Sequence, residues 1–298
     1  MEVIRARVMG FCMGVRRAVD IAWRESSAPG AVYTLGPLIH NPAVLQSLAG
    51  RGVTCLAENE IPTLPQNSTV IIRAHGVSPA LEAELLRQGL RVLDATCPHV
   101  KQSQKKARFF AERGYTVFLA GEKDHGEIAG IRGYIELAAP PSSGVPPCYV
   151  VASAEDAESA AAELLALAGG AQAELKTALI GQTTISKSEY DAIAGCLRRF
   201  FPAIEIQDTI CGATAQRQEA LRELCGKVDA VVVAGGRGSA NTRRLFSLAG
   251  ELGKPAYLVE SPQEIPSGIA VYKTVGLCAG ASTPDSLIAE IEEALRAF

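Results

Sequence analysis

The chain has 298 residues, of which 48% are hydrophobic and 20% are charged, a composition that fits a folded globular protein and excludes a disordered or collagen-like one. Its 29 Lys and Arg residues against 32 Asp and Glu residues leave a formal net charge of −3, which gives no general attraction to nucleic acid or to an anionic membrane. Apolar runs are far shorter than the roughly 20 residues that a membrane-spanning helix needs. Charges at Glu2, Arg5 and Arg7 also argue against a signal peptide. We therefore expect a cytoplasmic protein with neither a nucleic-acid nor a membrane partner.

Short β-branched segments alternate with segments of helical periodicity along the chain, and this alternation predicts α/β units built on parallel sheets. The expected strands are 3–10, 32–36, 69–74, 116–121, 176–181, 229–236 and 272–276. The expected helices are 15–24, 79–88, 100–113, 155–168, 187–200, 214–225, 242–252 and 284–297. Residues 138–147 are rich in proline, glycine and serine, which predicts a surface loop.

Three of the eight cysteines share one local pattern, in which a strand ends, a cysteine follows and a basic helix begins. They are Cys12, Cys97 and Cys211. Their separations, on the order of 100 residues, suggest one cysteine in each of three domains, with the three thiols meeting at a common centre. A thiol at the start of a helix lies close to unpaired N–H groups, which favour the thiolate.

Three converging thiolates can hold either zinc or an iron–sulfur cluster. The chain contains no C-x-x-C pair and no H-x-x-x-H or H-E-x-x-H spacing, which are the usual signals of a zinc site. An iron–sulfur cluster with three cysteine ligands would leave one iron open to substrate. The structural alternative is a packed thiol, which we expect for Cys55, Cys148, Cys196 and Cys225; Cys278 is left unassigned.

Histidines follow three of the expected strands, at His40, His75 and His125. Because the carboxyl ends of parallel strands form the ligand crevice of such sheets, we expect these imidazoles to face the same cavity as the thiolates. Glu127 lies two residues after His125 and would serve as a proton donor if burial raised its pKa. The alternative role for Glu127 is to cap the segment that follows.

Hydroxyl and amide side chains occupy the remaining strand ends, at Thr183, Thr184, Ser239, Asn241, Ser282 and Thr283. Beside helix N-termini, such neutral groups bind phosphate oxygens, and ordinary helix capping is the structural alternative. The segment GGRGSAN matches a dinucleotide-binding fingerprint only in part, because Asn241 replaces its third glycine, and no Walker A lysine is present. A redox role would therefore need electrons from another protein.

A series of segments that covers nearly the whole chain in order resembles the 4-hydroxy-3-methylbut-2-enyl diphosphate reductases. The segments are GFCMGVRRAV, GPLIHNP, IRAHGVS, DATCPHVK, GEKDHGE, GQTT, DTICGATAQRQ, GGRGSANT and AGASTPD. The resemblance implies an oxidoreductase that converts (E)-4-hydroxy-3-methylbut-2-enyl diphosphate to isopentenyl and dimethylallyl diphosphates with loss of water, in the last step of the methylerythritol phosphate route to isoprenoids. It also implies an external electron donor such as ferredoxin or flavodoxin.

The resemblance further implies three similar α/β domains in a trefoil around a central 4Fe–4S cluster that leaves one iron open. The implied thiolate ligands are Cys12, Cys97 and Cys211. With these cysteines as markers of the domain edges, the expected domains are 13–97, 98–207 and 208–298, the last joined by the N-terminal strand 1–12.

The implied substrate-binding residues are His40, His75, His125, Thr183, Ser239, Asn241 and Ser282, most of which would hold the diphosphate. The implied catalytic residues are Glu127, Thr183, Thr184 and His125; Glu127 and one of the two threonines would handle protons and the substrate hydroxyl. One departure is Ala240, where some members of the family have a second serine. The alternative function is a non-catalytic iron–sulfur sensor or small-anion-binding protein. A zinc or thiol-dependent hydrolase and a nucleotide-binding oxidoreductase are further rivals.

Overall fold

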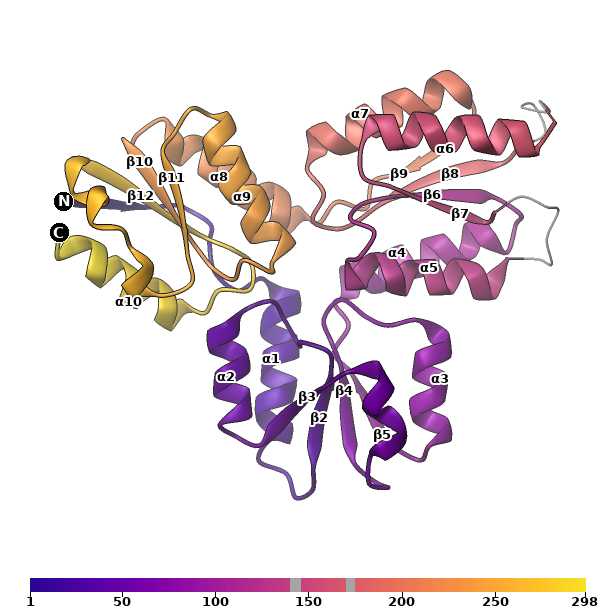
Figure 1. Ribbon diagram of the computed structural model, residues 1–298, viewed down its shortest axis with the longest axis horizontal. Coiled ribbons are helices and arrows are strands. Elements are labelled where there is room, and N and C mark those ends of the chain that lie inside the picture. The colour runs from indigo at the N-terminus through magenta and orange to yellow at the C-terminus, as the bar shows by residue number, and fades with distance from the viewer. Residues whose placement is uncertain (140–145, 170–174) are drawn as a thin grey trace. The chain divides into compact units, whose positions relative to one another are not determined.

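The computed structural model describes residues 1–139, 146–169 and 175–298, and within them the protein is an α/β structure with three four-stranded sheets. The strand pairings are parallel in every sheet. This confirms the fold class expected from the alternation of strands and helices (Figure 1). Most of the expected loop 138–147 lies outside the described residues.

The first sheet has the strand order β3-β2-β4-β5. Its strands are β2 (Val32–Leu35), β3 (Val53–Leu56), β4 (Thr69–Ile72) and β5 (Arg91–Asp94). The helices in this part of the sequence are α1 (Met13–Glu25), α2 (Pro42–Ala49) and α3 (Pro79–Arg87).

The second sheet has the order β7-β6-β8-β9. Its strands are β6 (Thr116–Ala120), β7 (Cys148–Val151), β8 (Thr177–Gly181) and β9 (Glu205–Gln207), and its helices are α4 (Pro98–Ala111), α5 (Gly126–Ala138), α6 (Ala154–Leu167) and α7 (Lys187–Phe200). Figure 1 shows α4 and α5 on one face and α6 and α7 on the other. Successive strand residues point to opposite faces, so Phe118 and Ala120 pack with α6 and α7 while Val117 and Leu119 pack with α4 and α5.

The third sheet has the order β1-β12-β10-β11. Its strands are β1 (Glu2–Arg5), β10 (Ala230–Ala234), β11 (Ala256–Val259) and β12 (Thr274–Ala279), and its helices are α8 (Gly212–Cys225), α9 (Ala240–Glu251) and α10 (Asp285–Arg296). The N-terminal strand β1 pairs in parallel with β12 from the other end of the chain. Helix α10 packs in the core on one face of this sheet, and α8 and α9 pack in the core on the other.

All three sheets repeat one topology when β1 is counted as the strand that follows β12. In each sheet the first strand lies between the second and the third, and the fourth strand is at the edge. These fourth strands are β5, β9 and β1, and the segments after them carry Cys97, Cys211 and Cys12. The cysteine pattern of the sequence therefore reflects a repeat of the fold.

The packing divides the chain into two compact units, one made of Met1–Ala57 with Gly212–Phe298 and the other of Glu58–Cys211. The boundary after Ala57 falls inside the expected domain 13–97. The strands β2 to β5 lie within that range and the strands β6 to β9 lie within 98–207. The three expected ranges remain predictions as domain boundaries, as does their trefoil arrangement.

Several short elements escape the sequence pattern: β3, β7, β11, α2 and α5 are absent from the expected strands and helices, whereas β5 and β9 are the strands expected before Cys97 and Cys211. Helix α5 contains Gly126, Gly130 and Gly133, and glycine weakens the local helix signal. Its close packing explains Gly133, because a Cβ there would lie 2.4 Å from the Cβ of Ser78. Helix α1 also begins at Met13 rather than at residue 15, directly after Cys12.

Among the described residues, no helix combines the length and the apolar character needed to cross a membrane.

Candidate functional site

The predicted site residues all lie between the end of a strand and the first turn of the next helix, and they divide between the two compact units. The unit that contains both chain ends carries Cys12, His40, Ser239, Asn241 and Ser282. The unit Glu58–Cys211 carries His75, Cys97, His125, Glu127, Thr183, Thr184 and Cys211. Each set is described by itself.

The three cysteines of the repeated pattern have equivalent backbone anchors. Each backbone N–H donates to a carbonyl two residues beyond the third strand of its own sheet. The acceptors for Cys12, Cys97 and Cys211 are Ala281, Ala74 and Thr183, at N–O distances of 3.1, 2.9 and 2.9 Å. These hydrogen bonds fix each cysteine against a loop that carries another predicted site residue, namely Ser282, His75 or Thr183 itself.

These three thiols differ from most of the other cysteines in their surroundings. They are half-buried and lie at helix starts. Cys196, Cys225 and Cys278 are buried, and burial raises the pKa of the Cys278 thiol and raises that of the half-buried Cys148 to about 12. The expectation of a packed thiol is wrong for Cys55, which is exposed because it lies on the edge strand β3.

Glu127 is the most completely buried of the candidate catalytic side chains, at 1% exposure. Its Oε1 accepts a hydrogen bond from the backbone N–H of Thr183 at 2.7 Å, and its Oε2 accepts from the Thr183 hydroxyl at 2.8 Å. Burial raises the pKa of this carboxyl to about 7, against the opposing effect of the two hydrogen bonds. Its side chain therefore bonds to the GQTT loop rather than capping its own helix, and the carboxyl can hold or release a proton near neutral pH.

His125 lies two residues before Glu127 in the chain, and the ring of His75 contacts the ring of His125. His125 and His75 meet edge to face, with ring centroids 5.1 Å apart and an interplanar angle of 87°. His125 is the N-cap of α5, and its Nδ1 accepts from the backbone N–H of Glu127 at 3.2 Å. An imidazole that accepts through Nδ1 carries its proton on Nε2 when neutral, so His125 presents a donor on its other side.

Thr184 is held by a residue that the sequence reasoning did not single out. The Nε2 of Gln182 donates to the Thr184 hydroxyl at 2.9 Å, and its Oε1 accepts from the backbone N–H of Glu122 at 3.0 Å. Gln182 has no exposed surface. Its place in the GQTT segment was the available signal, and it ties that segment to the loop that leads into His125.

In the other unit, buried neutral groups gather at the start of α9. Ser239 is its N-cap and accepts from the backbone N–H of Thr242 at 3.3 Å. Asn241 is only 4% exposed, and neither polar atom of its amide has a hydrogen-bond partner among the described residues. The hydroxyl of Ser282, also buried, donates to the His40 carbonyl at 3.1 Å. Because an unsatisfied buried amide is costly, Asn241 at a helix N-terminus indicates an anion site.

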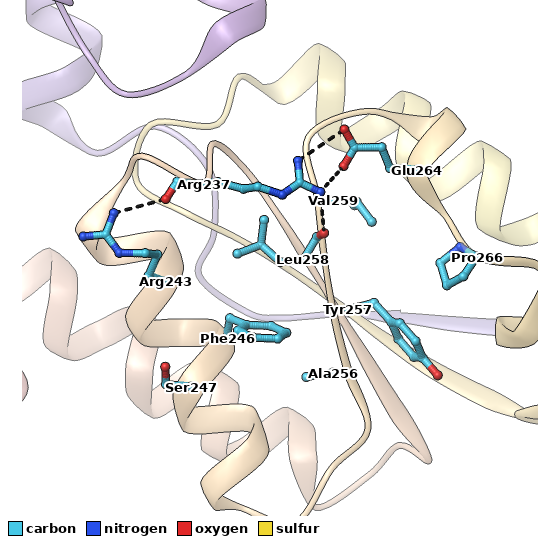
Figure 2. A pocket seen from close by; sticks show the side chains of 10 residues that line it. All are labelled: Arg237, Arg243, Phe246, Ser247, Ala256, Tyr257, Leu258, Val259, Glu264 and Pro266. Carbon is cyan, nitrogen blue, oxygen red and sulfur yellow. Dashed lines mark hydrogen bonds and ion pairs between the residues drawn. The ribbon is translucent and has the colours of Figure 1, made fainter.

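The loop before α9 is fixed from its other side by Arg237. Its backbone N–H and its guanidinium donate to Glu260 at 2.7 and 2.8 Å, and the guanidinium also donates to Glu264 at 2.6 Å. Figure 2 shows Arg237 at the edge of a cavity of about 550 Å³, which Phe246 and Tyr257 help to line. None of the predicted site residues lines this cavity. The ion pairs of Arg237 at its lining hold the loop before α9.

A second arginine, Arg73, lies against the start of α5. A Cβ on Gly126 would be 3.1 to 3.2 Å from three atoms of the Arg73 guanidinium, so a larger residue there would require the guanidinium to shift by a few tenths of an ångström. The Arg73 side chain is 17% exposed and pairs with Glu58 at 3.9 Å. Arg73 belongs to the IRAHGVS segment but is not among the predicted site residues.

The fold and these side chains define a class of protein: an α/β protein with polar side chains at its strand ends, a buried carboxyl whose pKa is raised to about 7, and partly exposed thiols. The family model of the LytB protein matches residues 3–296, and the chain belongs to this family.

Curated relatives named 4-hydroxy-3-methylbut-2-enyl diphosphate reductase are similar to the chain over nearly its full length. The protein from Treponema denticola is 43% identical, with 99% of this chain and 99% of the relative covered. That from Treponema pallidum strain Nichols is also 43% identical, with 99% and 83% covered. That from Aquifex aeolicus is 36% identical, with 99% and 96% covered.

Solved structures agree with this family assignment. One of (E)-4-hydroxy-3-methyl-but-2-enyl diphosphate reductase, the terminal enzyme of the non-mevalonate pathway, is 34% identical with a TM-score of 0.70 and covers 100% of both chains. The reductase from Plasmodium falciparum has a TM-score of 0.86 at 24% identity, covering 98% of this chain and 87% of its own, and supports the fold alone. The resemblance read from the motifs and the assignment to an oxidoreductase are confirmed, over the alternative of a non-catalytic sensor.

Proposed function

We propose that this protein reduces (E)-4-hydroxy-3-methylbut-2-enyl diphosphate to isopentenyl and dimethylallyl diphosphates. The reaction consumes two electrons and two protons: the allylic C–O bond breaks, one proton leaves with the oxygen as water and the other is added to carbon. The observation that carries the proposal is the buried Glu127 carboxyl bonded to the Thr183 hydroxyl, because this reaction needs a proton donor that is sheltered from water and still protonated near neutral pH.

The residues that would hold a 4Fe–4S cluster are Cys12, Cys97 and Cys211. Their chemistry fits that group, since all three are half-buried thiols at helix starts that form no disulfide, and thiolates are the usual ligands of such clusters. When bound, a cluster with three cysteine ligands supplies electrons singly and one iron that acts as a Lewis acid.

The diphosphate would be held by His40, His75, Ser239, Asn241 and Ser282. Support comes from the buried amide of Asn241, which lacks a protein partner, and from the buried hydroxyls of Ser239 and Ser282. These groups are neutral donors at or near helix N-termini, and such donors bind phosphate oxygens without a lysine.

Proton delivery would run from Glu127 through the hydroxyl of Thr183. A protonated Glu127 can donate to the oxygen of Thr183, which in turn donates to the substrate hydroxyl. The hydrogen bond between Thr183 and Glu127 favours Thr183 over Thr184 for this role, because the Thr184 hydroxyl accepts from Gln182 instead. His125 would act as a positioning and donor group, since its Nδ1 holds the backbone N–H of Glu127.

The electrons would come from a one-electron carrier protein such as ferredoxin or flavodoxin in the cytoplasm. Support for an external donor comes from the sequence, which offers only a partial dinucleotide fingerprint around Asn241.

The first experiment measures iron and acid-labile sulfide per chain after anaerobic purification, followed by turnover of the allylic diphosphate with a chemically reduced viologen as donor. We expect near-equal iron and sulfide in the amounts of a 4Fe–4S cluster and formation of both isoprenoid diphosphates. A cluster without turnover would favour the sensor or anion-binding alternative. Zinc in place of iron and sulfide would contradict the proposed cofactor.

A further inference from the structure

Arg217 is a buried cation that links two of the cysteine-bearing segments. It lies on α8, is only 4% exposed, and donates from its guanidinium to the carbonyl of Gly10 at 2.5 Å and to the carbonyl of Ala213 at 2.8 Å. Gly10 stands two residues before Cys12, and Ala213 two residues after Cys211. One side chain therefore joins the loop that leads into Cys12 to the first turn of the helix that follows Cys211.

The loop whose Gly10 carbonyl accepts from Arg217 has little conformational freedom at this point. Gly10 adopts a φ of +75°, and a Cβ there would lie 3.0 Å from the Asp285 carboxylate and 3.1 Å from Ile288. Two residues later the backbone N–H of Cys12 donates to Ala281. The segment 10–12 is thus held at one end by Arg217 and at the other by the loop after β12, which fixes the point from which the Cys12 thiol projects.

The charge of Arg217 matters as well as its hydrogen bonds. Arginine keeps its positive charge at physiological pH, and its planar fork can hold two acceptors at once. Burying a cation is costly unless other groups compensate it, whereas Arg222 on the same helix keeps its side chain exposed. A cluster ligated by thiolates becomes more negative on reduction, and a buried cation close by would favour the reduced state because screening there is weak.

We propose that Arg217 is a positioning residue for the iron–sulfur cluster, fixing the Cys12 loop against the start of α8 and raising the midpoint potential of the cluster. The inference rests on the proposed function, in which Cys12 and Cys211 are cluster ligands. Arg217 makes two separate contributions. Its hydrogen bonds to the carbonyls of Gly10 and Ala213 govern how firmly the cluster is retained, and its positive charge governs the midpoint potential of the cluster.

The experiment compares Arg217→Met, Arg217→Lys and the exposed control Arg222→Met on the anaerobically purified holoprotein. The readouts are iron and sulfide per chain, the rate of cluster loss to an iron chelator, the midpoint potential by redox titration and the EPR spectrum of the reduced state. Circular dichroism of each cluster-free form reports whether the chain is folded.

We expect Arg217→Met to lose its cluster about 10-fold faster or more, the range typical when a group that orients a metal ligand is removed, and to titrate at a more negative potential. Arg217→Lys keeps the charge without the fork, so it should lose the cluster faster while titrating near the wild-type potential. Arg222→Met should match wild type in both. If Arg217→Met does not fold, Arg217→Lys decides: faster loss supports the proposal and a wild-type rate contradicts it.

A wild-type protein that holds a cluster while both Arg217 variants match it in retention and potential would overturn this inference alone. A wild-type protein without iron and sulfide would instead overturn the proposed function. The two failures are therefore distinguishable in a single series of preparations.

Discussion

At the scale of single residues, buried polar side chains differ in whether the protein itself supplies their hydrogen-bond partners. Glu127 is buried but bonded at both oxygens by Thr183, so it forms a defined proton-holding pair. Asn241 is equally buried, yet its amide has no partner among the described residues. The first arrangement is complete within the protein, whereas the second lacks a hydrogen-bond partner, as expected if Asn241 belongs to the proposed anion site.

The pKa of Glu127 predicts the pH dependence of turnover. Because burial raises that pKa to about 7, the donor is protonated below pH 7, and the turnover rate at saturating substrate should fall as pH rises through that value. Glu127→Gln should keep the cluster and substrate binding while losing turnover by about 100-fold or more. Full activity in this variant, measured over pH 6 to 9 with a viologen donor, would remove Glu127 from the mechanism.

The same carboxyl links folding to pH. The folded protein binds this proton more tightly than the unfolded chain, whose reference pKa is 4.5, so the stabilisation is fully present below about pH 4.5 and is lost as pH rises through 7. The shift corresponds to about 3 kcal/mol of unfolding free energy. Urea unfolding of cluster-free protein should show this component in wild type and lack it in Glu127→Gln, and parallel pH profiles of the two would contradict it.

Two asparagines at helix starts offer a matched test of the anion site. Asn41 accepts from the backbone N–H of Val44 and caps α2, so Asn41→Ala should lower the unfolding free energy by about 1 kcal/mol. Asn241→Ala removes an amide without a protein partner, so it should leave the ligand-free stability nearly unchanged while raising KM for the allylic diphosphate by about 10-fold. The opposite pattern would make Asn241 a structural residue.

At the scale of elements, close packing decides where a helix forms despite weak local propensity. Helix α5 contains three glycines, yet it is a full helix of 13 residues whose first turn presents His125 and Glu127. The contact of Gly133 with Ser78 at the start of α3 accounts for one of these glycines. The placement of His125 and Glu127 therefore depends on a helix whose close packing against the start of α3 requires a glycine at position 133.

Two glycine-to-alanine changes separate helix propensity from packing. Gly195 in α7 has nothing within 4 Å of an added Cβ, so Gly195→Ala should raise the unfolding free energy by about 0.5 to 1 kcal/mol. Gly133→Ala would place a methyl group 2.4 Å from Ser78, and it should lower stability by about 1 to 3 kcal/mol. Thermal unfolding of both variants checks the pair, and a stabilised Gly133→Ala would refute the close-packing explanation.

At the scale of the whole molecule, one strand topology occurs three times, and a cysteine follows the edge strand each time. Each of those cysteines also donates its backbone N–H to the equivalent position of the adjacent loop. This repetition explains why three cysteines widely separated in the sequence have the same local surroundings. It supports the proposal that Cys12, Cys97 and Cys211, rather than the other cysteines, hold the cluster.

That assignment predicts different outcomes for cysteines outside and inside the repeat. Cys97→Ser should lose the intact cluster, measured as iron and sulfide per chain after anaerobic reconstitution. Cys55→Ser, which changes an exposed thiol on an edge strand, should retain it. Unchanged iron content in Cys97→Ser, or equal loss in both variants, would overturn the ligand assignment.

The amino-acid sequence by itself determined the fold class, because the periodicity of apolar residues is local and survives in most strands and helices. It also determined the family, because motifs such as GQTT and DATCPHVK are contiguous. It identified the side chains at the strand ends as candidates, since a polar residue after a buried strand is visible in the order of residues alone. The short strands and the glycine-rich helix α5 were missed because their stability comes from packing against neighbours.

Only the tertiary structure decided which of these side chains touch one another. The bond between Glu127 and Thr183 spans 56 positions of the chain, and that between Arg217 and Gly10 spans 207; no local pattern encodes such pairs. Burial is likewise a property of the folded molecule, and it moves the pKa of Glu127 to about 7. Periodicity indicates which face of an element is buried, but the partner that a buried polar group finds depends on how the distant segments fold together.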